Sequence, residues 1–165
     1  MISRGVYFFS GDFNPHLFIY PSLLMYILFF VDGVVYLVGS LLGQFDSLSQ
    51  FTELYHTDPA LFYIPNRLVI AAFAILSIYA TFVLARFTFG KKTAFLSIIL
   101  MALLPVHVLH SHFVTTDVPC ILFVVLSFYY SIKILQSGTL KHYVLAAVFG
   151  GLAAGIKYNG GAVVL

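Results

Sequence analysis

The sequence predicts an all-α integral membrane protein, a multi-span helical bundle. Hydrophobic residues make up 61% of its 165 residues and charged residues only 8%, whereas about a quarter of the residues in a typical soluble domain are charged. Residues 68–85 contain no charged residue. As a helix rising ~1.5 Å per residue, this run would nearly cross the ~30 Å hydrocarbon layer of a bilayer. The net charge of +2 is too small to suggest a nucleic-acid partner.

The first part of the chain, residues 1–67, is expected to be a large external loop with interfacial helices. Residues 17–43 are long and apolar enough to cross a membrane, but Pro21, Asp32 and several glycines interrupt them. Such breaks favour a segment that lies along the membrane surface, and a crossing helix is the alternative. Residues 44–66 contain acidic residues but no Lys or Arg, which is typical of an external loop.

Residues 68–165 are expected to form about four membrane-spanning helices. The first is the uncharged run described above. The second begins at Thr93, and Pro105 is expected to kink it near its end, because proline removes a helical hydrogen bond. The third begins at Pro119, in the first turn where proline is tolerated. The fourth covers residues 143–165.

The basic residues orient these helices. Arg86, Lys91 and Lys92 fall in one turn, and Lys133 and Lys141 flank another turn two spans away. Cytoplasmic loops of membrane proteins are enriched in Lys and Arg, so both turns are expected to be cytoplasmic. The opposite ends of the helices are then expected to face the outside or the lumen.

Asp117 is the only acidic residue between Ala60 and Leu165. A carboxylate at the bilayer centre costs roughly 2.5–3.5 kcal/mol on insertion scales, so Asp117 is expected at a helix end or in a wet cavity. Two interpretations stay open. Asp117 is either a functional carboxylate or a helix cap before Val118 and Pro119.

Three histidines, His107, His110 and His112, precede Asp117. His107 and His110 are one helical turn apart and share a face, so a divalent metal is possible. Their spacing matches no standard zinc motif. We favour the alternative that these are polar rings at the membrane interface or in a hydrogen-bonded helix end, and the sequence indicates no other cofactor.

Lys157 lies in the outer half of the predicted fourth span, which is otherwise free of charge there. A lysine buried there needs an anion, either Asp117 or a bound phosphate, and the alternative is a lysine that snorkels to the interface. Arg67 precedes the first span and could bind the same anion or be a plain interfacial arginine. Gly151 and Gly155 have the spacing that lets a neighbouring helix approach closely.

Five segments of the chain match a known order of motifs. They are residues 11–23 (GDFNPHLFIYPSL), 66–68 (NRL), 86–92 (RFTFGKK), 111–117 (SHFVTTD) and 151–158 (GLAAGIKY). In this order they resemble the N-terminal part of polyprenyl-phosphate-dependent glycosyltransferases of the C-type membrane fold. That group includes protein O-mannosyltransferases and aminoarabinose transferases.

The resemblance implies that a sugar moves from a dolichyl- or undecaprenyl-phosphate carrier to a protein or lipid acceptor at the extracytoplasmic or lumenal face. It implies that Asp117 is catalytic and orients the acceptor, the sugar or a metal, supported by His112. Lys157 and Arg67 would bind the donor phosphate, because fixed cations stabilise the departing charge. Related enzymes also have an earlier span, an acidic residue in the first loop and further C-terminal spans. We therefore expect this chain to be a fragment that is inactive alone.

Two other classes of function stay open, a membrane transporter and a structural membrane subunit. A transporter would normally have broken helices or repeats with paired charges. A structural subunit would need no polar cluster.

Overall fold

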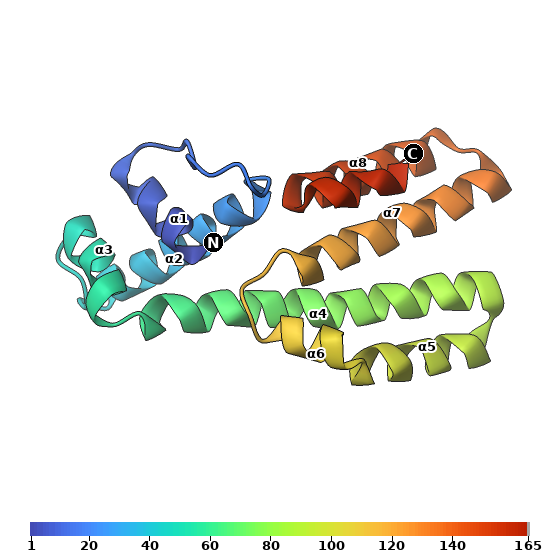
Figure 1. The fold of residues 1–165 in the computed structure, drawn as a ribbon, viewed down its shortest axis with the longest axis horizontal. Coiled ribbons are helices and arrows are strands. Elements are labelled where there is room, and N and C mark those ends of the chain that lie inside the picture. The colour runs from blue at the N-terminus through green and yellow to red at the C-terminus, as the bar shows by residue number, and fades with distance from the viewer. Residues whose placement is uncertain (165) are drawn as a thin grey trace. The chain divides into compact units, whose positions relative to one another are not determined.

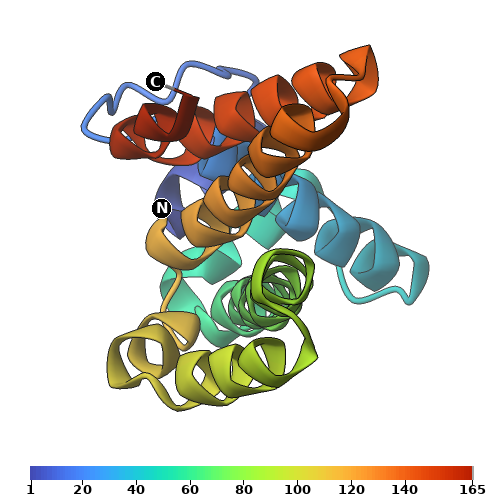
Figure 2. The same ribbon diagram turned by 90° about the vertical axis from the view of Figure 1, so that its right-hand side faces the viewer.

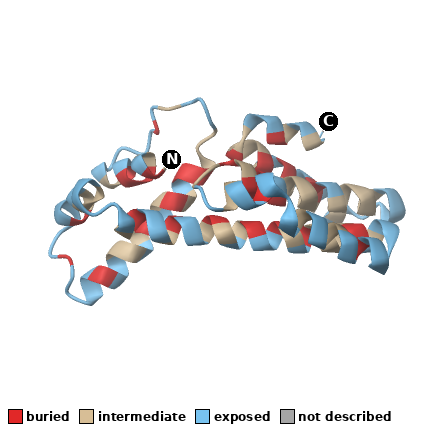
Figure 3. Ribbon diagram, turned by 60° about the horizontal axis from the view of Figure 1, so that its bottom comes forward, coloured by how far each residue is buried: buried red, intermediate tan, exposed pale blue. Residues whose placement is uncertain are grey.

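A computed structural model describes residues 1–164, and helices are the only regular elements among them (Figure 1). The chain divides into two compact units, Met1–Val69 and Ile70–Leu165. Much of the helical surface is exposed in Figure 3, and large apolar side chains make up a substantial part of it. The helices and their apolar surface confirm the predicted class, an all-α membrane protein.

The first unit is held together by aromatic side chains. It comprises α1 (Ile2–Tyr7), the short 3₁₀ helix η1 (Phe8–Ser10), α2 (Leu23–Leu41), α3 (Leu48–Thr57) and the start of α4 (Ala60–Phe89). The ring of Phe8 stacks on Tyr26 of α2 with 5.0 Å between centroids. Phe51 of α3 lies 4.8 Å from Phe62 of α4, and both of these side chains are fully buried. The ring of Phe9 contacts both Phe29 of α2 and Phe51 of α3, so aromatic contacts connect η1, α2, α3 and the start of α4 beside buried aliphatic side chains of α2.

The segment between η1 and α2 contains an Asx-type turn. Asp12 Oδ1 accepts a hydrogen bond from the backbone N–H of Asn14 at 2.9 Å, and Asn14 Oδ1 accepts one from the N–H of His16 at 3.0 Å. Asp12 Oδ2 also lies 2.8 Å from Nε2 of His16. The hydrogen bond from His16, followed by the bond from Asn14, holds the pKa of Asp12 below its usual value.

Asp32 and Asn66 make a buried polar contact between α2 and α4. Asn66 Nδ2 donates to Asp32 Oδ1 at 2.7 Å and to the carbonyl of Phe62 at 2.9 Å. The two residues are 1% and 0% exposed. Asp32 Oδ2 and Asn66 Oδ1 have no hydrogen-bond partner within residues 1–164. Both atoms are acceptors, so a donor at position 32 would complete the contact.

We expect Asp32→Asn to keep or raise the stability of the protein, because the amide supplies the donor that a carboxylate lacks. Asp32→Ala should lower the free energy of unfolding by about 1–3 kcal/mol, since it leaves Asn66 buried and unsatisfied. Thermal unfolding of both variants in one detergent measures the difference. An asparagine variant less stable than the alanine variant would contradict this account of the contact.

The second unit contains the remaining helices. It begins within α4 and continues with α5 (Lys91–Leu103), α6 (Pro105–Ser111), α7 (Asp117–Ser137), α8 (Leu140–Ile156) and the 3₁₀ helix η2 (Tyr158–Val164). Aromatic pairs connect α4 to its neighbours. The rings of Phe82 and Phe95 link it to α5, and those of Phe73 and Phe123 link it to α7.

Among residues 1–164, three helices are long and apolar enough to cross a membrane, α2, α4 and α7. The pair α5 and α6 would form a further span with a 60° bend. The bend lies at Leu104, whose backbone is extended, immediately before Pro105. Proline disfavours helical backbone in the residue before it, so the predicted kink is confirmed and has a local cause.

The last helix is shorter than the sequence predicted. Residues 143–165 were expected to form one span, but α8 ends at Ile156, and Lys157 has extended backbone with φ −149° and ψ 129°. The chain then folds back as η2. A Cβ atom at Gly160 would lie 2.6 Å from the carbonyl oxygen of Ala153 and 2.7 Å from Sγ of Cys120. Only glycine fits at position 160, where the chain turns back against α8. The apolar pattern of the sequence did not indicate this change of direction.

Helices α7 and α8 lie side by side as an antiparallel pair (Figures 1 and 2). Ser127 Oγ donates to the carbonyl of Ala146 at 2.9 Å across this contact. A Cβ at Gly151 would have no neighbour within 4 Å, whereas one at Gly150 would lie 3.3 Å from Ser127 Oγ. The close approach expected at Gly151 therefore occurs one residue earlier, on the face that carries the buried residues of α8. These are Ala146, Gly150, Ala153 and Ile156.

Candidate functional site

Asp117 stands at the start of α7 and makes two side-chain contacts. Lys157 Nζ donates to its Oδ1 at 2.6 Å, and its Oδ2 lies 3.1 Å from Nδ1 of His110. The N-cap residue of α7 is Thr116, and it makes no side-chain cap hydrogen bond. Both oxygens of Asp117 thus contact side chains outside α7, and no hydrogen bond described for residues 1–164 has this side chain capping the helix.

The arrangement of α7 and α8 brings Asp117 and Lys157 together. Because the two helices are antiparallel neighbours, the first residue of α7 lies beside the residue that follows α8. The helix dipoles also favour these charges, since the start of a helix attracts an anion and its end attracts a cation. Each side chain is still about a third exposed, at 34% for Asp117 and 35% for Lys157. A bound ligand can therefore reach both charges.

The histidine that contacts Asp117 is His110, not His112. The ring of His112 instead has its Nδ1 2.7 Å from the carbonyl oxygen of Val108, at the end of its own helix. Successive residues of a helix are rotated by about 100°, so residues two positions apart point in nearly opposite directions. The spacing in the sequence indicated that His107 and His110 share a face and that His112 does not, but it did not indicate which of them contacts Asp117.

The structure does not gather the histidines into a metal site. Within the described part of the chain, no three His, Cys, Asp or Glu side chains are placed to hold a metal ion. His110 and Asp117 would supply only two ligands. His107 is 5% exposed and lines the same cavity as His110 and Asp117, but no hydrogen bond or ion pair joins it to either of them within residues 1–164.

Arg67 belongs to the first unit. It is exposed, and its guanidinium carbon lies 5.9 Å from the centroid of the Tyr63 ring, one helical turn earlier in α4. This is the geometry of a weak cation–π contact. Its binding of a donor phosphate stays a prediction.

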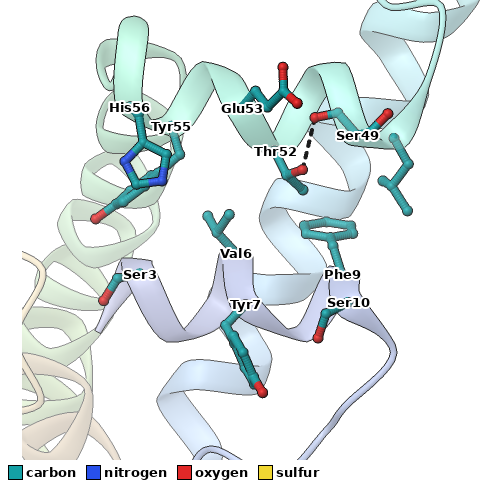
Figure 4. A pocket seen from close by; sticks show the side chains of 11 residues that line it. Ser3, Val6, Tyr7, Phe9, Ser10, Ser49, Thr52, Glu53, Tyr55 and His56 are labelled. Carbon is teal, nitrogen blue, oxygen red and sulfur yellow. Dashed lines mark hydrogen bonds between the residues drawn. The ribbon is translucent and has the colours of Figure 1, made fainter.

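The first unit has a groove of about 640 Å³ between α1 with η1 and α3 (Figure 4). In this view Val6 of α1 and Thr52 of α3 face the groove, and Thr52 Oγ1 donates to the carbonyl of Ser49 at 2.9 Å. The cavity beside Asp117 is smaller, at about 200 Å³. None of the predicted site residues lines the groove, so we place the candidate site at Asp117.

The comparison with known families covers the part of the chain that contains this candidate site. Residues 60–165 match the model of the dolichyl-phosphate-mannose-protein mannosyltransferase family. The chain belongs to this family. The match includes Asp117, Lys157, His110 and Arg67. No curated protein and no solved structure matches the chain.

Family membership confirms the resemblance seen in the sequence. It assigns the chain to membrane glycosyltransferases of the mannosyltransferase type, and the apolar helices agree with an integral membrane protein. The family's name specifies a dolichyl-phosphate-linked mannose donor and a protein acceptor for the family.

Proposed function

We propose that Asp117, Lys157 and His110 belong to the active site of an enzyme that transfers mannose from dolichyl phosphate to a protein hydroxyl group. The observation that supports this most is the partly exposed contact between Asp117 and Lys157, at 2.6 Å. Family membership favours this function over a transporter or a structural subunit. An undecaprenyl carrier and a lipid acceptor are the alternatives.

In the reaction, the bond between the sugar and the phosphate oxygen breaks, and the lipid phosphate leaves with the bonding electrons. The acceptor hydroxyl forms the new bond to the sugar, and its proton passes to a carboxylate base, a role for which Asp117 is available once the donor phosphate has taken its place at Lys157. Negative charge therefore accumulates on the departing phosphate. A fixed cation beside that oxygen stabilises the transition state more than the ground state.

Lys157 is suited to this task because it is held at the end of α8 and keeps part of its surface open. In the free protein, Asp117 neutralises it, which lowers the cost of a charge near the membrane. When a donor binds, its phosphate competes for the ammonium group and leaves Asp117 available to the sugar or the acceptor. Arg67 is proposed as a second cation for the phosphate.

His110 fixes the orientation of the Asp117 carboxylate through its second oxygen. It is a positioning residue, and it takes the supporting role that the resemblance implied for His112. The exposed ring of His112 remains a candidate for contact with substrate.

A transfer assay tests the function. Membranes containing the full-length protein are given dolichyl phosphate carrying labelled mannose, together with a peptide that contains serine and threonine. We expect label in the peptide, and less label when the carrier is undecaprenyl phosphate. The proposal would be contradicted if the labelled mannose stayed on its carrier in every assay, whichever carrier supplied it and whether a peptide or a lipid was offered as acceptor.

We also propose that the site faces the outside or the lumen and that residues 17–43 lie along that membrane surface. Single cysteines at Ser111, Ser10 and Ser47, in a Cys120→Ala background, should react with an impermeant thiol reagent applied from that side. A cysteine at Thr93 should not react, because it follows the basic turn. Reaction at Thr93 but not at Ser111 would reverse the orientation, and opposite accessibility of Ser10 and Ser47 would make α2 a true span.

A further inference from the structure

A cavity of about 200 Å³ lies beside the contact between Asp117 and His110. Both of these residues line it, together with His107, and the remaining wall is apolar. The apolar lining residues are Met101, Leu104, Val106, Val118 and Ile121. The cavity is smaller than the ~300–1,000 Å³ of sites for drug-sized ligands but larger than the ~30 Å³ that one water molecule occupies. It therefore suits a ligand of about the size of one sugar ring.

His107 is the most buried polar residue on this wall, with 5% of its surface exposed. Neither Nδ1 nor Nε2 has a hydrogen-bond partner of ordinary geometry among residues 1–164. A weak hydrogen bond to the backbone of Ala74, outside ordinary hydrogen-bond geometry, engages at most one of the two ring nitrogens and leaves the other without a partner among these residues. Buried polar atoms are nearly always hydrogen-bonded in proteins, so this ring lacks a partner that a ligand could supply.

The position of His107 explains why a ligand could reach so buried a ring. It also lines a second cavity, of about 310 Å³, which includes Ala74, Ser111 and His112. His107 thus lies between two cavities. A neutral imidazole has one donor and one acceptor nitrogen, which matches a hydroxyl group that can donate and accept at once.

We propose that His107 hydrogen-bonds a hydroxyl group of the donor's sugar ring in the cavity beside Asp117. The inference rests on the proposed function. It adds a residue that would distinguish the sugar-bearing lipid phosphate from the same lipid phosphate without a sugar. His107 contacts neither Asp117 nor Lys157 in any hydrogen bond or ion pair described for residues 1–164. Its effect should therefore be confined to recognition of the sugar.

The test compares two ligands on the full-length protein in detergent, a short-chain dolichyl phosphate carrying mannose and the same lipid phosphate without the sugar. His107→Phe keeps a flat ring of similar size and removes both nitrogens. We expect it to weaken binding of the mannose-bearing lipid about tenfold, the effect of losing one well-formed hydrogen bond. Binding of the bare lipid phosphate should not change.

Two further variants complete the comparison. His107→Gln retains a donor and an acceptor and should recover part of the lost affinity. His142→Phe changes a histidine in the first turn of α8, where its ring contacts Ser137 and Thr139, and should leave both affinities unchanged. Gel filtration and thermal unfolding show whether each variant is folded.

A second measurement uses the wild-type protein and does not depend on whether His107→Phe folds. In protein labelled with ¹⁵N-histidine, the ring signals assigned to His107 should shift when the mannose-bearing lipid is added and stay in place with the bare lipid phosphate. Unchanged ring signals, or equal affinity for the mannose-bearing lipid in wild type and a folded His107→Phe, would overturn the inference while leaving the proposed function intact. Wild-type protein that binds neither lipid would overturn the proposed function and this inference with it.

Discussion

Asp117→Asn is expected to lower sugar transfer by the full-length protein by roughly 10²- to 10⁴-fold, the range over which a positioned acid–base group contributes to catalysis. The amide has nearly the shape of the carboxylate and can still accept a hydrogen bond from Lys157 Nζ. The negative charge, however, is lost. The amount of folded protein in the membrane should stay the same, because α7 does not depend on Asp117 as its N-cap residue.

The measurement is the initial rate of label transfer at saturating donor, normalised to the amount of folded protein. Asp46→Asn is the matched control, since it removes an exposed carboxylate from the loop before α3. It should transfer at the wild-type rate. Loss of protein with normal turnover per folded molecule would mean that Asp117 is structural, and the site assignment would fail.

Lys157→Met is expected to cause the second large loss of transfer activity. Methionine keeps the apolar stem and removes the charge, so transfer should fall by roughly 10²- to 10³-fold, as when one electrostatic donor is removed from an active site. Affinity for the lipid phosphate should fall as well. Stability should fall by no more than about 1 kcal/mol, because both partners of the ion pair are partly solvated.

Lys157→Arg and a double variant distinguish the roles of this lysine. Arginine preserves the charge but presents a planar group, so partial activity is expected. Because Asp117 is the partner of Lys157 in the structure, Asp117→Asn combined with Lys157→Met should recover stability lost in either single variant. Unchanged affinity for the donor in Lys157→Met would remove this residue from the phosphate site.

The sequence by itself determined the class of the protein and the positions of most helices. Uncharged apolar runs of sufficient length predict helices in a membrane because no other local structure satisfies the backbone there. The kink at Pro105 was also predictable from the local sequence, because proline disrupts its own helix and restricts the backbone of the residue before it. Asp117 was identified because it is the only acidic residue in a long apolar region.

Only the tertiary structure decided which side chains meet. Asp117 and Lys157 are 40 positions apart, and the sequence offered both Asp117 and a phosphate as the partner of the lysine. The choice of His110 over His112 follows from the direction in which each ring leaves α6. The end of α8 at Ile156 follows from the return of the chain, where Gly160 packs against Ala153. The hydrophobic pattern of a sequence indicates which residues of one segment are buried. The partner of Lys157, the choice of His110 and the end of α8 depend instead on distances between atoms of different segments.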